Sequence, residues 1–244
     1  MGFKAVAGLD EVGMGPLAGP AVAAAVILPL GVRLPGLDDS KRLPQRRREA
    51  VELEIRRRAR ALAVGVVEAE EIDRHGLTWA RERAMRIAVE SLATAADYLL
   101  IDAYDLPPVP LPQLAVIKGD TFCASIMAAS VVAKVYRDRL MQDYDRAFPG
   151  YGFALHKGYA TELHRSRLAE LGPCPIHRLS WLPLRALREG DSEGEAGQRV
   201  GGRAGSGPAL GHHPGPVADA LGGVDLGPDA VEDGEAEAAV GSPL

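Results

Sequence analysis

Short apolar runs alternate along the chain with longer stretches of helical periodicity. Five runs predict buried β-strands, at residues 4–9, 21–28, 61–68, 98–102 and 114–117. Four longer stretches predict helices, at residues 44–60, 77–92, 125–146 and 160–171. The early strands are not joined by regular crossover helices, whereas the later strands alternate with helices. We therefore predict an α/β fold whose sheet is partly antiparallel and flanked by helices.

Three of the predicted helices carry end signals. Pro44 stands where proline is favoured, at the first helical position, and Thr78 is a candidate N-cap of the second helix. Pro149-Gly150 follows the third helix and predicts its end. These residues and the apolar period together set the predicted helix boundaries.

Residues 190–244 differ in composition from the rest of the chain. They contain two basic residues, Arg199 and Arg203, against ten acids, and no aromatic residue. The whole chain has 28 basic and 33 acidic residues and a net charge of −5. Residues 1–189 therefore contain 26 basic and 23 acidic residues and carry a net charge of +3. A segment so poor in apolar side chains cannot bury enough surface to offset its ordering entropy. We predict one domain over residues 1–189 and a disordered tail over residues 190–244.

Length and composition indicate an ordinary globular protein. The chain has 244 residues, of which 47% are hydrophobic, and this is enough for a core. It has no secretion signal and no apolar run of membrane-spanning length, so we expect a cytoplasmic protein without membrane contact. Cys123 and Cys174 have no partner at zinc-ligand spacing and are expected to be free thiols. A monomer is the expected state.

Three of the predicted strands lead to acidic side chains at or just after their carboxyl ends. Asp10 and Glu11 follow the first run, Asp102 ends the fourth, and Asp120 follows the fifth. Such charges are costly next to apolar strands unless cations compensate them, and carboxylate oxygens suit Mg²⁺ and Mn²⁺. The loop Gly13-Met14-Gly15 follows shortly after Asp10 and Glu11, and its backbone amides can approach a ligand closely. The pattern predicts metal-dependent phosphate chemistry.

Longer motifs occur in order along the chain. They are Gly8-Leu9-Asp10-Glu11-Val12-Gly13, Leu37-Asp38-Asp39-Ser40-Lys41, Ile117-Lys118-Gly119-Asp120, residues 128–138, Pro149-Gly150-Tyr151-Gly152-Phe153, His156-Lys157-Gly158-Tyr159 and Pro175-Ile176-His177-Arg178. In these motifs the chain resembles the bacterial ribonuclease HII family, from residue 4 to residue 182. The resemblance implies a ribonuclease H-like mixed sheet flanked by helices, with a helical C-terminal extension.

The same resemblance implies an activity. The family consists of endoribonucleases that cleave the RNA strand of RNA–DNA hybrids and incise 5′ of single ribonucleotides embedded in duplex DNA. They leave 3′-hydroxyl and 5′-phosphate ends and use two divalent cations, Mg²⁺ or Mn²⁺. Asp10, Glu11, Asp102 and Asp120 match the family's acidic metal-site residues, and they are the four acids that the strand pattern indicates.

Recognition of RNA requires a group that senses the 2′-hydroxyl. By resemblance, backbone groups of Gly13-Met14-Gly15 do so together with Tyr159. The family has Gly-Arg-Gly in this loop, so we expect Met14 to weaken affinity more than chemistry. His156 and His177 lack the spacing of a transition-metal site, and we assign them no catalytic role. Further candidate contacts to the substrate backbone are Lys41, Arg42, Ser130, Lys134, Arg137 and Lys157.

Three other interpretations are weaker. Gly13-x-Gly15-x-x-Ala18 satisfies the glycine fingerprint of dinucleotide-binding enzymes, but Asp10 and Glu11 would repel a pyrophosphate. A catalytically silent hybrid-binding module would gain nothing from clustered acids facing phosphates. A ribonuclease HIII-like enzyme shares much of the core, but that group carries an added N-terminal domain, whereas the first predicted strand here begins within ten residues of Met1.

Overall fold

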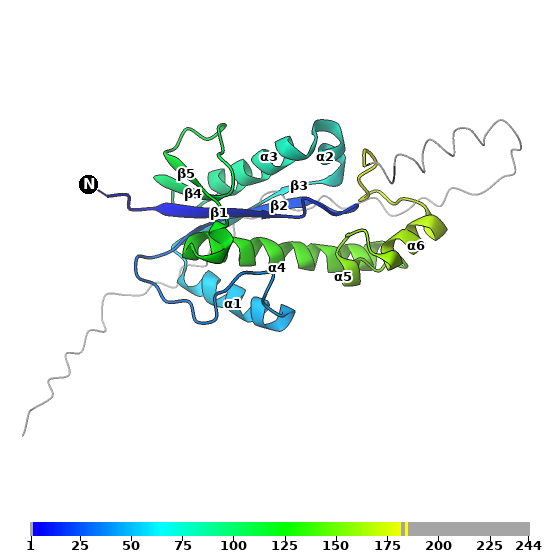
Figure 1. Ribbon diagram of the computed structural model, residues 1–244, viewed down its shortest axis with the longest axis horizontal. Helices are drawn as coiled ribbons and strands as arrows, with labels where there is room; N and C mark the ends of the chain where they lie inside the picture. Colours follow the sequence, from blue (N-terminus) through cyan, green and yellow to red (C-terminus); the bar gives the residue numbers. More distant parts are fainter. Residues whose placement is uncertain (1, 182–183, 185–244) are drawn as a thin grey trace, which may run out of the picture.

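The computed structural model describes residues 2–181 and 184 of the chain (Figure 1). Their strands form one five-stranded sheet in the order β3-β2-β1-β4-β5. β1 (Val6–Val12), β2 (Ala21–Ile27) and β3 (Ala61–Val67) are antiparallel neighbours. β4 (Tyr98–Asp102) runs parallel to β1, and β5 (Gln113–Val116) runs parallel to β4. The prediction of a partly antiparallel α/β sheet is confirmed.

The composition of β2 explains why both faces of the sheet are covered. All 7 residues of this strand are apolar and buried. Val22 and Val26 pack into a core cluster on one face, whereas Ala23 and Ala25 belong to a second cluster on the other face. Side chains alternate across a strand, so a strand with no polar face needs packing partners on both sides. The alanines leave room for helices to come close.

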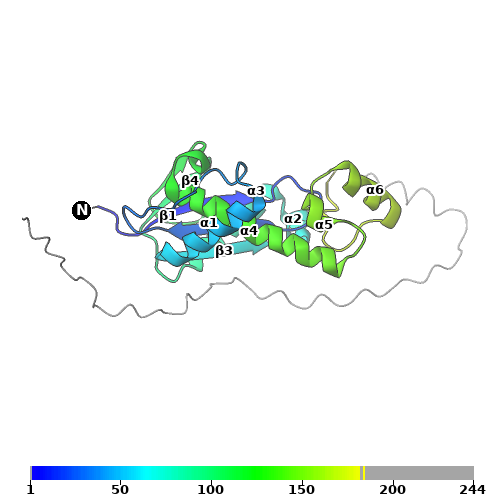
Figure 2. The same ribbon diagram turned by 90° about the horizontal axis from the view of Figure 1, so that it is seen from below.

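Helices form the two outer layers of the molecule (Figure 1). α1 (Gln45–Arg58) and the long α4 (Ala124–Ala147) lie on one face of the sheet, and both stand in front of it in Figure 2. α3 (Leu77–Glu90) and the short α2 (Ala69–His75) lie on the other face. The four helices at residues 44–60, 77–92, 125–146 and 160–171 are therefore present, with ends shifted by up to two residues.

The predicted helical extension follows α4 at one end of the sheet. It consists of α5 (Phe153–His156) and α6 (Glu162–Leu171) (Figure 1). Thr161 caps α6, because its hydroxyl accepts a hydrogen bond from the N–H of His164 at 3.2 Å. Leu168 of α6 packs with Leu17 and Leu184, and this contact ties the extension to the loop between β1 and β2.

Several local predictions were wrong. α2 and α5 were not predicted, because helices of 7 and 4 residues are too short to show an apolar period. Thr78 does not cap α3: Gly76, with φ of 85°, is the N-cap, and Thr78 lies inside the helix. β1 continues to Val12 because β2 pairs with its last residues, so Asp10 and Glu11 lie within the strand rather than after it.

The remaining expectations concern features outside the sheet. The predicted tail, residues 190–244, lies outside the described residues. In the described part of the chain, no helix combines the length and the apolarity needed to cross a membrane. Cys123 and Cys174 are both free thiols, as predicted.

Candidate active site

Strand register brings three of the predicted acids to one edge of the sheet. Leu9 of β1 lies opposite Ile101 of β4, and the two strands are parallel, so the next residues, Asp10 and Asp102, are neighbours. The 3-10 helix after β5 carries Asp120, whose backbone N–H donates to Asp102 Oδ1 at 3.4 Å. Acids that are more than a hundred residues apart along the chain thus meet at the carboxyl ends of β1, β4 and β5.

The fourth acid, Glu11, approaches the same strand end from the other face of the sheet. Consecutive side chains of a strand point to opposite faces. Asp10 accordingly lies within hydrogen-bonding reach of the Ser130 hydroxyl on α4, whereas Glu11 faces Arg81 on α3. Asp102 raises the pKa of both carboxyl groups. The pair therefore presents carboxylates on both sides of the end of β1.

Burial makes the ionised forms of these acids costly. The pKa of Asp10 is raised to about 8. Burial is the largest cause of this rise, the charges of Glu11 and Asp102 contribute to it, and the hydrogen bond of the Ser130 hydroxyl opposes it. Burial also raises the pKa of Glu11 to about 7, against the opposing effect of Arg81. The pKa of Asp102 is raised by burial and by the charge of Asp120. The site is thus short of positive charge.

Lys41 supplies part of that missing charge. Its Nζ donates to Asp120 Oδ2 at 2.8 Å, and this bond raises the pKa of Lys41. The aspartate side chain is 7% exposed, but the lysine side chain is 76% exposed. The loop that carries Lys41 is attached to α4, because Ser40 Oγ and Ser130 Oγ are hydrogen-bonded at 2.9 Å. One exposed ammonium group cannot balance four clustered carboxylates.

The donor set fits a divalent cation in its chemistry. The Oε2 atom of Glu11 is buried and has no hydrogen-bond partner, and the nearby oxygens are the hard ligands that Mg²⁺ and Mn²⁺ prefer. Within the described residues, no three Asp, Glu, His or Cys side chains are already arranged to coordinate one ion. Binding would therefore require the carboxylates to turn inward and Asp120 to exchange Lys41 for the cation.

The raised pKa values predict how metal binding depends on pH. Asp10 and Glu11 hold protons more tightly in the folded protein, where their pKa values are about 8 and 7, than at their ordinary pKa values of 3.8 and 4.5. Their contribution to metal-free stability is therefore greatest at low pH and is lost as the pH rises through this window. A cation that binds the deprotonated groups reverses the loss. We expect Mg²⁺ or Mn²⁺ to raise the melting temperature more at pH 8 than at pH 6.

Scanning fluorimetry with and without the metal at each pH isolates this effect, because the contributions of other titrating groups cancel in the difference. Asp10→Asn should reduce the pH dependence of the shift, because Asp10 then no longer titrates in this window while Glu11 still does. Equal shifts at the two pH values would contradict the prediction.

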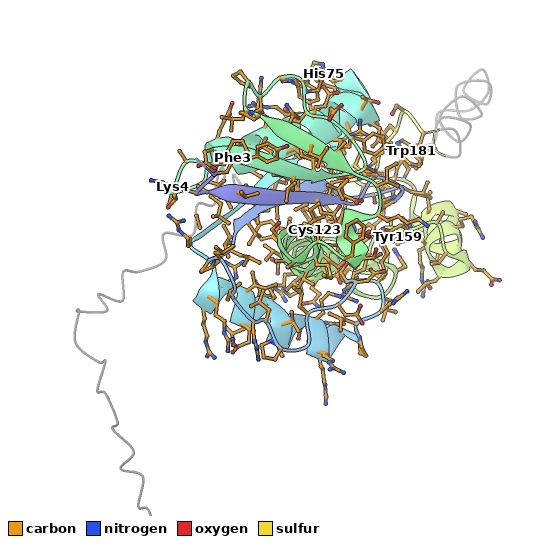
Figure 3. All side chains as sticks on the ribbon, turned by 60° about the vertical axis from the view of Figure 1, so that its left-hand side comes forward. Phe3, Lys4, His75, Cys123, Tyr159 and Trp181 are labelled. Carbon is orange, nitrogen blue, oxygen red and sulfur yellow. The ribbon has the colours of Figure 1, made fainter. Side chains whose placement is uncertain are left out.

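The predicted glycine loop lies beside Tyr159. A Cβ atom added to Gly15 would lie 3.9 Å from Tyr159 Cε1, and Tyr159 is 40% exposed. Leu17 N–H donates to the carbonyl oxygen of Gly158 at 2.8 Å, which ties the two loops together. Tyr159 and Trp181 lie toward one end of the molecule, away from Phe3 and Lys4 near the start of β1 (Figure 3). The loop and Tyr159 thus form one surface at the end of β1.

The other predicted substrate contacts differ in how accessible they are. Lys41 and Arg42 have exposed side chains, and Arg42 lies 3.9 Å from Asp39. Lys134 is paired with Asp138 at 2.6 Å. Lys157 Nζ donates to Ala154 O at 2.7 Å, and burial lowers the pKa of this lysine. Lys41 and Arg42 therefore have the more accessible side chains, although each has an acidic partner.

Two expectations about side-chain position were wrong. Ser130, a candidate substrate contact, does not lie at the surface: it is 4% exposed, and its hydroxyl is hydrogen-bonded to that of Ser40 at 2.9 Å. Arg137 is fully buried and donates to backbone carbonyls, so its guanidinium cannot contact a phosphate at the surface. Both lie on α4, where the sequence gives the residue type but not the depth at which the helix packs.

The histidines near the C-terminal extension are structural. His164 Nε2 and His177 Nε2 lie 3.1 Å apart, and His156 Nε2 lies 2.9 Å from the carbonyl oxygen of Tyr151. Burial lowers the pKa of all three, which keeps them neutral. These contacts support the expectation that His156 and His177 take no part in catalysis.

Sequence reasoning missed Arg81. It lies on α3, outside every recognised motif, and its charge lowers the pKa of Glu11. Its guanidinium also stacks on the Tyr104 ring, 3.8 Å from the ring centroid. Only the packing of α3 against the sheet brings it to the acids, so the sequence offered no signal for it.

Comparison with known proteins agrees with this geometry. A family model described as Ribonuclease HII matches residues 7–183. The chain is 56% identical to the Ribonuclease HII of Geobacter metallireducens over 177 residues, which are 72% of this chain and 83% of that protein. It is 51% identical to that of Geobacter sulfurreducens over 184 residues, which are 75% and 85% of the two chains. The crystal structure of the ribonuclease H2 from Pyrococcus horikoshii OT3 is similar with a TM-score of 0.67 at 25% identity, over 78% of this chain and 100% of that one.

Proposed function

The chain belongs to the ribonuclease HII family, and from this premise we propose in detail how it acts. It is a metal-dependent endoribonuclease of the type 2 ribonuclease H class, acting on RNA–DNA hybrids. The proposal is that it also incises duplex DNA 5′ of a single embedded ribonucleotide and leaves 3′-hydroxyl and 5′-phosphate ends. We further propose that it works as a monomer in the cytoplasm.

The observation that carries the proposal is the cluster of Asp10, Glu11, Asp102 and Asp120, whose negative charge is only partly balanced by Lys41 and Arg81. Three of these carboxyl groups have raised pKa values, and one buried oxygen of Glu11 has no partner. Such a cluster does not stabilise the fold, so we attribute its presence to the binding of a cation. We propose Mg²⁺ or Mn²⁺ held by these four residues.

Two such cations, when bound, would activate a water molecule and stabilise the leaving oxygen of the scissile phosphate. The residues of the chain supply the rest. The Ser130 hydroxyl hydrogen-bonds Asp10 and favours its ionised form, and Arg81 favours the ionised form of Glu11. Lys41 is exposed and flexible enough to turn from Asp120 to a phosphate oxygen of the substrate. Arg42 stands beside it as a second exposed cation. A covalent nucleophile is not needed.

The glycine loop and Tyr159 recognise the ribonucleotide. The N–H groups of this loop can bond a 2′-hydroxyl, and the adjacent ring can pack against the sugar. The proximity of Gly15 to the Tyr159 ring, which an added Cβ atom would meet at 3.9 Å, supports this division of roles, because both groups can then reach one ribose. An inert hybrid-binding module is the second candidate, but nothing in the acid cluster favours it.

Cleavage of three duplexes tests the proposed function. The first is DNA with one ribonucleotide, the second an RNA–DNA hybrid and the third an all-DNA control, each with Mg²⁺ and with Mn²⁺. We expect the first two to be cut and the control to stay intact. A hybrid that is cut while the lone ribonucleotide is untouched would reject the finer proposal, and no cleavage of either would favour the inert module.

Replacing Met14 by arginine tests whether recognition uses the backbone. We expect Met14→Arg to tighten substrate binding about fivefold by adding one positive charge near a phosphate. The single-turnover rate should stay within about twofold, because the loop N–H groups are unchanged. Met14→Gln, which has similar length but no charge, is the control and should leave affinity as it is. A rate loss of tenfold or more would contradict recognition by the backbone.

A further inference from the structure

Two fully buried arginines lie behind the glycine loop. Arg137 comes from α4 and Arg178 follows the loop after α6, and each has 0% exposure. Neither forms an ion pair with a carboxylate within the described residues. A buried charge needs hydrogen bonds to offset the loss of water, and here backbone carbonyl groups supply them.

Arg178 binds the carbonyl groups of the glycine loop itself. Its Nη2 donates to Gly13 O at 2.5 Å and to Gly19 O at 2.8 Å, and its Nη1 donates to Met14 O at 3.3 Å. Its Nε also donates to Gly19 O, at 3.0 Å. One rigid guanidinium thus fixes both ends of the segment between residues 13 and 19.

Arg137 binds the neighbouring backbone and reaches the second loop. It donates to Pro20 O at 3.0 Å, to Ala18 O at 3.1 Å and to Lys157 O at 2.9 Å. Its guanidinium carbon lies 6.0 Å from the centroid of the Tyr159 ring. The space is full, because a Cβ atom on Gly13, whose φ is +86°, would come within 2.3 Å of Arg137 Nε. The glycine loop and Tyr159 therefore rest on the same pair of side chains.

The direction of these carbonyl groups decides where the loop N–H groups point. In a planar trans peptide, the C=O bond and the following N–H bond point in opposite directions. Arg178 draws the carbonyl groups of Gly13 and Met14 inward, so the N–H groups of Met14 and Gly15 turn the other way. Neither of these N–H groups has a hydrogen-bond partner among the described residues. Two donors are thus held ready beside Tyr159.

We infer that Arg178, supported by Arg137, is a positioning residue for ribose recognition: it anchors the glycine loop so that the N–H groups of Met14 and Gly15 are presented to a 2′-hydroxyl. The inference rests on the proposed role of this loop in sensing the ribonucleotide. It assigns the arginine of the Pro175-Ile176-His177-Arg178 motif to substrate selection, through the backbone and without contact to the substrate. A lysine at this position could reach fewer of the carbonyl groups, because its donors come from one nitrogen.

The test measures discrimination rather than activity. In an Asp10→Asn background, which prevents cleavage, dissociation constants are compared for a duplex with one ribonucleotide and for the same duplex without it. We expect Arg178→Gln to reduce the ratio of the two constants tenfold or more, and Arg178→Lys to reduce it at least threefold. Should Arg178→Gln fail to fold, Arg178→Lys decides alone.

A matched control separates positioning from general destabilisation. Ile55 is buried where α1 packs on α4, in a core cluster that contains neither the glycine loop nor Tyr159. Ile55→Ala should lower the melting temperature to a similar extent and leave the discrimination ratio unchanged. Folded Arg178 variants whose ratio stays within twofold of the parent would overturn the inference. If the parent itself shows no discrimination, the proposed ribose recognition fails instead.

Discussion

Replacing Asp10 by asparagine is expected to lower cleavage by roughly 10³-fold or more while raising the melting temperature of the metal-free protein. The loss of activity follows because this carboxylate is a proposed cation ligand at the centre of the acid cluster. The gain in stability follows because burial and two neighbouring acids raise the pKa of Asp10 to about 8. Near neutral pH this shift opposes folding by up to several kcal/mol, since each pKa unit corresponds to about 1.4 kcal/mol.

Single-turnover cleavage and thermal unfolding without metal measure the two effects of Asp10→Asn. The stability gain should grow from pH 5 to pH 8, because over this range the carboxyl group of the unfolded chain is already ionised whereas that of the folded chain still holds its proton, up to a pKa of about 8. Asp105→Asn is the control: this exposed acid follows β4 by three residues and should change neither quantity. If Asp10→Asn cleaves at the wild-type rate, the acid cluster is not the reaction centre.

Replacing Tyr159 by alanine is expected to reduce incision at a lone ribonucleotide about 100-fold, with the melting temperature changed by only a few degrees. Tyr159 is 40% exposed and its ring lies beside Gly15, so removal of the ring takes away a packing surface for the sugar but little of the core. The loss should be smaller on a continuous RNA–DNA hybrid, in which several ribonucleotides offer alternative positions for cleavage.

Tyr159→Phe is the matched variant for this experiment. It keeps the ring, and the hydroxyl group of Tyr159 has no hydrogen bond within the described residues. We expect it to retain activity within a few-fold of wild type. A large fall in the melting temperature of Tyr159→Ala would show that the ring is needed for packing and would remove it from the recognition surface.

The sheet could be predicted from the sequence because its signals are local. The five strands were found from apolar runs alone, and the uniformly apolar segment 21–28 required two covering layers of helices. The long helices were found from their apolar period. The helices α2 and α5 could not be predicted, because they are too short to show an apolar period. The extension of β1 to Val12 could not be predicted either, because it depends on pairing with β2 across the sheet.

The chemistry of the site divides in the same way. The sequence by itself determined which acids accompany the strands and which loop is rich in glycine, because apolar runs and residue types are local properties. Only the tertiary structure decided that Asp10 and Glu11 approach from opposite faces, that Arg81 reaches Glu11, and that Arg178 lies beneath the glycine loop. Depth of burial and partners far along the chain arise when helices pack on the sheet, and no window of sequence contains that information.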